Sequence, residues 1–192
     1  MPLAEVMLDV FSQQDDARVF GGWQVYDKHL CEIVASDPTF AGSLDSLLES
    51  DHKPKPGDFL HQIFGPTTHQ TMLMDRVFLV VHTLAAMGKA IIVGRGGSEV
   101  TKGMAQGISL RLVAAEKSRI ARIMEMLDLS EPDAGVVVHK RDADRGRLMK
   151  DHFGVDIADP AGYDMTWNTD SSSFEEIAHS VAVLVRSRVP RD

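Results

Sequence analysis

Charged side chains of both signs are concentrated in residues 139–151, where they could bind and neutralise phosphate groups. Within about three helical turns the segment carries the basic residues Lys140, Arg141, Arg145, Arg147 and Lys150 and the acidic residues Asp142, Asp144 and Asp151. Two interpretations stay open. The first is a solvated helix face braced by ion pairs between successive turns. The second is a mobile flap whose arginines close over a transferring phosphoryl group and neutralise its developing charge.

Arg95 is a second candidate for anion binding. It follows the apolar segment Ala90–Val93, which is typical of a strand buried on both faces, and lies within Gly94-Arg95-Gly96-Gly97. The glycines allow a sharp turn at the carboxyl end of the strand, where open α/β sheets bind ligands. A guanidinium group there could hold a phosphate or carboxylate by two hydrogen bonds. The alternative is a tight turn with Arg95 in solvent, which a short glycine motif by itself favours.

More arginines follow along the chain. Arg111 lies in the next apolar segment, and Arg119 and Arg122 lie on the helix predicted after it. In a parallel α/β sheet these elements meet at the carboxyl edge that also receives Arg95. We therefore expect several guanidinium groups to surround one small, multiply charged anion. A nucleotide fits this description better than a nucleic acid does.

Composition narrows the class of protein. The 192 residues suffice for one domain with a buried core, and the net charge of −8 argues against general nucleic-acid binding. One cysteine excludes an intrachain disulfide, and the scattered histidines indicate no metal site. The longest apolar stretch, residues 72–87, contains Asp75, Arg76 and His82, and the N-terminus lacks a signal-peptide pattern. We expect a cytoplasmic protein that does not interact with membranes.

Apolar periodicity predicts the elements that position these residues. Helices are predicted over 3–20, 28–35, 68–87, 115–127, 130–150 and 173–188, and strands over 23–26, 90–93, 108–114 and 163–168. Val6–Phe11 could equally be a short strand. Residues 37–56 are interrupted by proline, glycine and serine and predict an irregular insertion, which extends to about residue 68. The alternation predicts an α/β fold with a parallel sheet and right-handed crossovers. The apolar helix 68–87 could serve a homodimer as well as a core.

The order of the motifs resembles that of the cytidylate kinase-like family, which belongs to the P-loop nucleoside monophosphate kinases. The resemblance covers about residues 22–189 and rests on Trp23–Leu30, Gly94-Arg95-Gly96, the strand Leu110–Ala114, the pair Arg119 and Arg122, Asp142 with Arg145, Phe153-Gly154-Val155-Asp156, Tyr163-Asp164 and Asn168-Thr169-Asp170. It implies a single three-layer domain over residues 1–192, with strands in the order second, third, first, fourth, fifth. It also implies phosphoryl transfer from ATP, with Mg²⁺, to a nucleoside monophosphate such as CMP.

The resemblance also implies roles for individual residues. Matched by position, the acceptor nucleotide would be bound by Tyr26, Asp27, Arg95 and Gly96. Arg119 would bind the donor nucleotide, and the catalytic residues would be Arg122, Asp142 and Arg145. Residues 37–68 would shape the acceptor site, and residues 131–156 would form a lid-like segment.

One part of the family pattern is missing from this sequence. Family members begin with a strand, a glycine-rich phosphate loop and a helix, and the backbone N–H groups of that loop hold the β-phosphate. Residues 1–22 contain no such loop, since their only glycines are Gly21 and Gly22. The missing strand would be the central one. Val6–Phe11 could occupy its place, the sheet could close differently, or another chain could contribute it.

Three hypotheses about function follow. The first is a nucleoside monophosphate kinase-like enzyme. The second is a catalytically silent nucleotide-binding or regulatory domain that kept the acceptor side and lost the phosphate loop. The third is a chain whose true start lies upstream of Met1 and supplies the loop. Because phosphoryl transfer depends on positioning and electrostatics, loss of the loop should greatly slow catalysis.

Overall fold

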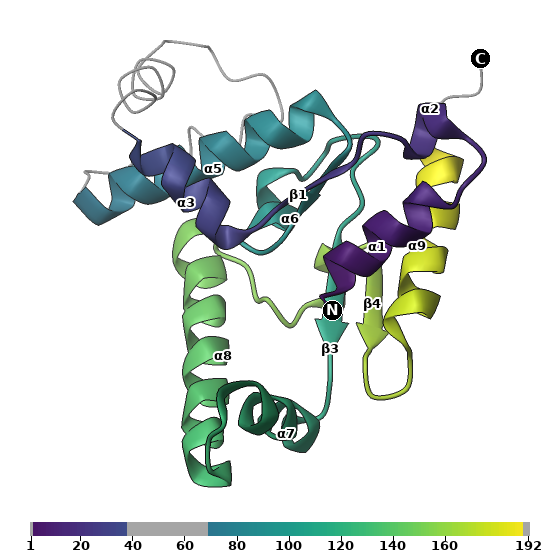
Figure 1. Ribbon diagram of the computed structural model, residues 1–192. Coiled ribbons are helices and arrows are strands. Elements are labelled where there is room, and N and C mark those ends of the chain that lie inside the picture. The colour runs from purple at the N-terminus through teal and green to yellow at the C-terminus, as the bar shows by residue number, and fades with distance from the viewer. Residues whose placement is uncertain (1, 38–68, 190–192) are drawn as a thin grey trace. The chain divides into compact units, whose positions relative to one another are not determined.

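The computed structural model describes residues 2–37 and 69–189 and contains helices and short parallel strands (Figure 1). In chain order the elements are α1 (Leu3–Ser12), α2 (Ala17–Phe20), β1 (Gln24–Tyr26), α3 (Lys28–Ser36), α5 (His69–Met87), β2 (Ala90–Ile92), α6 (Gly97–Val100), β3 (Leu110–Val113), α7 (Glu116–Leu127), α8 (Glu131–Phe153), the 3₁₀ turn η2 (Pro160–Gly162), β4 (Met165–Asn168) and α9 (Phe174–Arg188). They form two compact units, one of residues up to Gly107 together with those from Ala178, the other of residues 108–177. The single-domain organisation stays a prediction.

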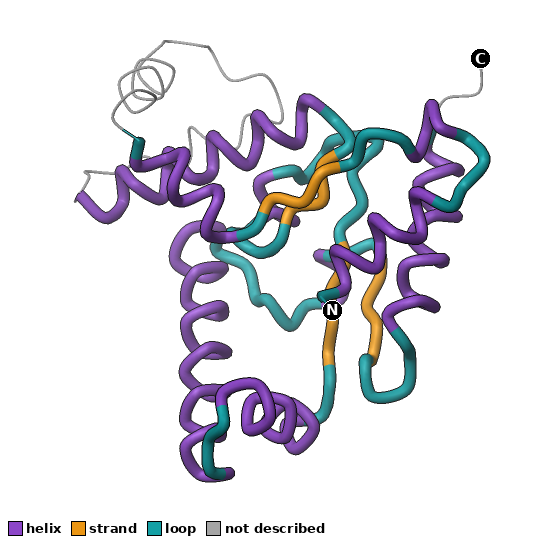
Figure 2. Tube along the Cα trace, viewed as in Figure 1, coloured by secondary structure: helices purple, strands orange, loops and turns teal. Residues whose placement is uncertain are grey.

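The strands form two parallel pairs, drawn in orange in Figure 2. In the first unit β1 pairs with β2, with Gln24 opposite Ala90 and Tyr26 opposite Ile92. In the second unit β3 pairs with β4, with Leu110 opposite Met165. The predicted α/β class with parallel strands is therefore confirmed, and both pairings agree with the strand order that the resemblance implies. The three-layer arrangement stays a prediction.

The expectation that Ala90–Val93 forms a strand buried on both faces is wrong. β2 is half-buried along its length, and Val93, just after it, is exposed. The physical reason is that burial on both faces is typical of strands inside a covered parallel sheet, whereas β2 has β1 as its only strand neighbour among residues 2–37 and 69–189.

The N-terminal segment is helical, so the alternative of a strand at Val6–Phe11 is wrong. α1 buries Val6, Met7, Val10 and Phe11 on one face, a spacing that suits a helix. The ring of Phe11 packs against Phe20 and Trp23, with ring centroids 5.4 and 5.0 Å apart. The indole N–H of Trp23 donates to the Val19 carbonyl at 2.9 Å. Within the described residues, therefore, no strand fills the central place that the resemblance implies.

The core of the first unit is built around α5. Val77, Phe78, Val80 and Val81 are buried on this helix, which contacts α3, α6 and β2. Its end is as predicted, because Gly88 follows with a φ of +80° that glycine adopts readily. The homodimer expected from this helix stays a prediction. No helix among the described residues has the length and apolarity needed to span a membrane.

Asp75 lies among these apolar residues of α5 and is 2% exposed. Its Oδ1 atom has no hydrogen-bond partner among the described residues. Burial raises the pKa of the Asp75 carboxyl from 3.8 to about 6, because the charged form is poorly solvated there. The native protein therefore holds a proton that the unfolded chain releases between about pH 4 and pH 6, so stability falls as the pH rises through that window.

Replacing Asp75 with asparagine is expected to remove this loss of stability at higher pH. At pH 8 the free energy of unfolding should rise by about 1–3 kcal/mol, whereas at pH 4 it should change little. Urea unfolding at both pH values measures the difference, with Asp9→Asn, an exposed acid on α1, as the control. An equal effect of Asp75→Asn at the two pH values would contradict the assignment.

In the second unit α7 and α8 form a helical hairpin. Ile123 of α7 packs with Ala134 and Val138 of α8. The Ser130 hydroxyl accepts from the Asp133 N–H at 3.4 Å and thereby caps α8. α8 continues to Phe153, where Gly154 ends it with a φ of +67°. The segment 131–156 is therefore mostly one long helix, and its action as a lid stays a prediction.

Candidate functional site

Facing side chains of α7 and α8 form a polar seam, defined here as Glu116, Arg119, His139, Asp142 and Arg145. The residues of each helix lie three positions apart and so fall on one face. His139 Nε2 lies 3.0 Å from Glu116 Oε1. One turn on, Arg119 donates through Nη1 to Asp142 Oδ2, while Arg145 Nη1 lies 3.3 Å from Asp142 Oδ1. The seam thus gathers two guanidinium groups around one carboxylate.

The seam is accessible enough for a ligand to reach it. The side chains of Arg119, Asp142 and Arg145 are 32%, 40% and 62% exposed. Ion pairs at such exposure are weak, worth about 0–1 kcal/mol each. The Nε of Arg119 is buried and has no hydrogen-bond partner among the described residues. This region could therefore exchange its internal carboxylate for the oxygens of a phosphate.

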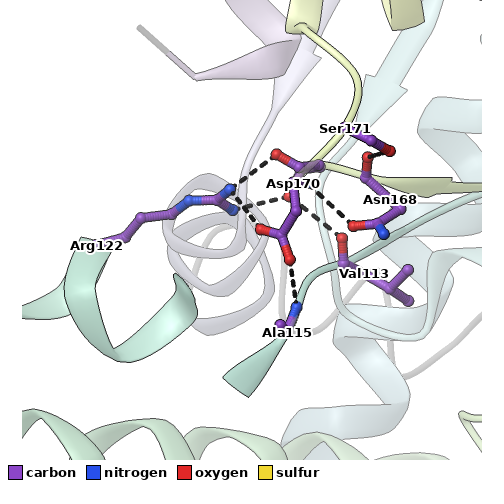
Figure 3. A network of polar contacts seen from close by, with 7 residues as sticks. Val113, Ala115, Arg122, Asn168, Asp170 and Ser171 are labelled. Atoms are coloured by element: carbon purple, nitrogen blue, oxygen red, sulfur yellow. Dashed lines mark hydrogen bonds and ion pairs between the residues drawn. The ribbon is translucent and has the colours of Figure 1, made fainter. Parts of the chain in front are cut away.

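Arg122, the next predicted site residue, holds the turn that follows β4 (Figure 3). Its guanidinium donates to the Thr169 hydroxyl and carbonyl, both at 2.8 Å, and to Asp170 Oδ1 at 3.2 Å. Asp170 Oδ2 in turn accepts from the Ala115 N–H at 2.7 Å, just before α7. Arg122 therefore ties α7 to the end of β4, and its predicted catalytic role would require these bonds to be shared or exchanged.

The pKa of Asp170 is lowered from 3.8, chiefly by the hydrogen bond from the Ala115 N–H, with further contributions from Ser118 and Arg122. A lowered pKa means that ionised Asp170 stabilises the fold above about pH 4. This contribution is lost as the pH falls through the lowered native value.

Replacing Asp170 with asparagine should therefore destabilise the protein near pH 6, and the difference from wild type should shrink toward pH 2. Unfolding followed by Trp167 fluorescence in a Trp23→Phe background measures it, because Trp167 lies on β4 beside this turn. A difference that is the same at every pH would show that charge is not the cause.

Arg111, expected to join the other arginines, instead contacts the loop before β4. Its Nη1 donates to the Ile157 carbonyl, and its guanidinium lies 5.5 Å from the centre of the Tyr163 ring. The Tyr163 hydroxyl donates to the same carbonyl at 3.1 Å. These contacts fix the loop and occupy Arg111 within the protein.

In the first unit Arg95 lies just after β2 and is largely buried, its side chain 17% exposed. Its Nη1 lies 3.1 Å from Glu32 Oε1 of α3, so the alternative of a solvent-exposed Arg95 is wrong. Arg95 has a φ of +55°, between Gly94 at +80° and Gly96 at +65°. Non-glycine residues adopt this conformation at a cost, which is common where a side chain must be presented to a ligand.

The other predicted acceptor residues lie at the same end of the β1–β2 pair. Tyr26 ends β1, and its hydroxyl donates to Gln24 Oε1 at 2.6 Å. Asp27 follows it, and its carbonyl accepts from the Cys31 N–H at 3.2 Å in the first turn of α3. Cys31 is fully buried, and burial together with the Asp27 charge raises the pKa of its thiol. We interpret Cys31 as a core residue.

The predicted site residues thus fall into groups. Arg119, Asp142 and Arg145 meet in the seam, and Arg122 lies on the same helix as Arg119. Tyr26, Asp27, Arg95 and Gly96 lie at the carboxyl end of the first strand pair. Convergence of the two groups on one ligand stays a prediction. Glu32, the partner of Arg95, was not predicted, because nothing local pairs residues so far apart in the chain. Thr169 was singled out only as part of the motif Asn168-Thr169-Asp170 and not as the partner of Arg122.

The fold is that of a known structure. The chain superposes on the crystal structure of an uncharacterized protein from Eubacterium ventriosum with a TM-score of 0.73 and 18% sequence identity, over 96% of this chain and 90% of the other. Because the sequence identity is low, this likeness shows that the two proteins share one α/β fold and shows nothing more. The model of the cytidylate kinase-like family matches residues 21–171. The chain therefore belongs to the cytidylate kinase-like family and has a nucleotide kinase-like fold. A search of curated proteins finds no match.

Proposed function

We propose that this protein binds a nucleoside phosphate and that the seam arginines Arg119 and Arg145 hold its phosphate groups. The observation that carries the proposal is their convergence, from two helices, on the single carboxylate of Asp142. Two arginines that already bind one carboxylate are spaced to bind a phosphate in its place, and guanidinium groups bind phosphate oxygens well. Arg95, with its buried Nε unpaired among the described residues, is the proposed phosphate-binding residue on the acceptor side.

The residues fit the phosphates of ATP better than they fit a resident metal ion. Among the described residues no group of three or more histidine, cysteine, aspartate or glutamate side chains could hold a metal. Mg²⁺ that arrives bound to a nucleotide needs fewer protein ligands, because phosphates and water supply most of its ligands. When bound, ATP with Mg²⁺ would supply the phosphoryl group and neutralise part of its charge, while Arg119 and Arg145 would orient the phosphates.

Phosphoryl transfer from ATP to a nucleoside monophosphate such as CMP is the activity that membership in this family favours. Binding without transfer is the second candidate, and a specific observation favours it. Residues 2–20, which would precede the acceptor strand as strand, phosphate loop and helix, are instead two helices fixed by the Phe11, Phe20 and Trp23 rings. If no other residues supply a backbone cradle for the β-phosphate, the donor would be poorly positioned and transfer would be slow.

Two measurements test these proposals. Isothermal titration with CMP, other monophosphates and ATP, the last with and without Mg²⁺, measures binding. If none of these ligands binds, the proposed function is wrong. Chromatography of a reaction with ATP, Mg²⁺ and each monophosphate then separates the candidates, because only transfer forms a diphosphate. Diphosphate above a protein-free blank supports the kinase. Monophosphate binding without any diphosphate supports the silent nucleotide-binding protein.

A further inference from the structure

Asp142 occupies both seam arginines at once. One carboxylate oxygen, Oδ2, accepts from Arg119 Nη1 on α7, and the other, Oδ1, lies 3.3 Å from Arg145 Nη1 on its own helix. A single anion that bridges two guanidinium groups in this way uses the same donors that a phosphate would use. A phosphate can therefore gain these donors only if Asp142 gives them up.

The carboxylate leaves some of this donor capacity unused. Arginine has five N–H donors, and Asp142 accepts from one terminal nitrogen, Nη1, of each of the two arginines. A carboxylate offers two oxygens, whereas a terminal phosphate offers three and carries more charge. Exchange of Asp142 for a phosphate would therefore satisfy more donors than the internal bridge does.

The exchange is energetically accessible. Arg119, Asp142 and Arg145 are all partly exposed, so water screens the internal bridge and its opening costs little. Without Asp142, two positive groups would lie close together with no anion between them, which would favour an incoming polyanion. We propose that Asp142 is an internal counter-ion that competes with ligand phosphates for Arg119 and Arg145 and thereby lowers the affinity for nucleotides.

This inference rests on the proposed function, but it also predicts the direction in which the nucleotide affinity changes when Asp142 is removed. The proposed function alone does not predict that direction. If Asp142 served only to position the arginines for a ligand, its removal would weaken binding. If Asp142 competes with the ligand, its removal strengthens binding. The catalytic role implied for Asp142 by the family resemblance predicts a loss of turnover and no gain in affinity.

The test compares Asp142→Asn with Asp144→Asn, which removes the same charge two residues away at an exposed position of α8. Dissociation constants are measured by titration with CMP, ATP and inorganic tripolyphosphate. We expect Asp142→Asn to bind about threefold to tenfold more tightly than wild type. Asp144→Asn should stay within about twofold, because the bulk field of one exposed charge is screened by salt. In an Arg145→Ala background the gain from Asp142→Asn should shrink.

Circular dichroism verifies that each variant is folded, and Asp142→Ala, a better helix former, is the second variant if asparagine unfolds α8. If wild type binds these ligands and both Asp142 variants bind equally or more weakly, the competition is wrong while the proposed function stands. If neither wild type nor the Asp142 variants bind any of them, the proposed function itself fails. Binding by the Asp142 variants alone supports the competition. If Asp142→Asn raises the affinity for tripolyphosphate as much as the affinity for ATP, the site recognises the phosphates and not the nucleoside.

Discussion

Replacing Phe11 with alanine is expected to lower the free energy of unfolding of the first unit by about 3–5 kcal/mol, the range for deletion of a buried aromatic ring. Phe11 is 1% exposed and packs against the rings of Phe20 and Trp23. Its loss leaves a cavity between α1, α2 and the segment that leads into β1. The large effect is expected because these rings join the N-terminal helices to the rest of the unit.

Denaturant unfolding followed by Trp23 fluorescence in a Trp167→Phe background measures this effect, because only the first unit then contains tryptophan. Val183→Ala on α9, where Val183 is 72% exposed, is the control and should change the unfolding free energy by less than about 0.5 kcal/mol. A loss below about 1 kcal/mol for Phe11→Ala would mean that the N-terminal helices are not an integral part of the unit. It would also remove the structural support for binding without phosphoryl transfer.

Replacing Arg119 with alanine is expected to weaken nucleotide binding about tenfold to a hundredfold, the effect of losing hydrogen bonds from a charged donor. The variant also leaves Asp142 with Arg145 as its partner in the seam but without Arg119, so its carboxylate is less neutralised and would repel an incoming phosphate more strongly. Arg119→Lys keeps the charge but loses the planar fork, and its affinity should fall between those of wild type and Arg119→Ala.

Titration calorimetry with CMP and ATP measures the loss, and Arg147→Ala, an exposed arginine of α8, controls for the removal of one positive charge. Arg147→Ala should change the affinity by no more than about threefold, because its contribution is long-range and screened. Equal affinities for wild type and Arg119→Ala would place the phosphates elsewhere and would exclude the seam as the binding site.

Most elements could be predicted because their signals are local. Ser173 and Glu176 form the capping box that begins α9, with the Ser173 N–H donating to Glu176 Oε2 at 2.7 Å and the Glu176 N–H donating to the Ser173 hydroxyl at 3.1 Å. Gly88 and Gly154 end their helices with positive φ angles. One exception is Val6–Phe11, where a short apolar run suits a strand or a buried helix equally well. Packing of Phe11 against Phe20 and Trp23 selected the helix.

The candidate site was predictable by residue type but not by partner. An arginine-rich segment and a Gly-Arg-Gly turn indicate anion binding before any coordinates are known. The partners of these arginines come from elsewhere in the chain: Glu32 lies 63 positions before Arg95, and Asp142 lies 23 positions after Arg119. Arg111 carries the same charge as Arg119, yet it contacts a backbone carbonyl and an aromatic ring. Of the predicted insertion at residues 37–68, only Asp37 is among the described residues.

The sequence by itself determined the α/β class and the positions of most helices and strands, because periodicity and caps act over short distances, and the order of its motifs indicated the family. It predicted neither α6 nor the break that divides the expected helix over 3–20 into α1 and α2. Only the tertiary structure decided how each arginine is used. Whether a guanidinium meets a carboxylate, a carbonyl or a ring depends on which elements pack together. That packing is set by long-range burial of apolar surface, which no local pattern encodes.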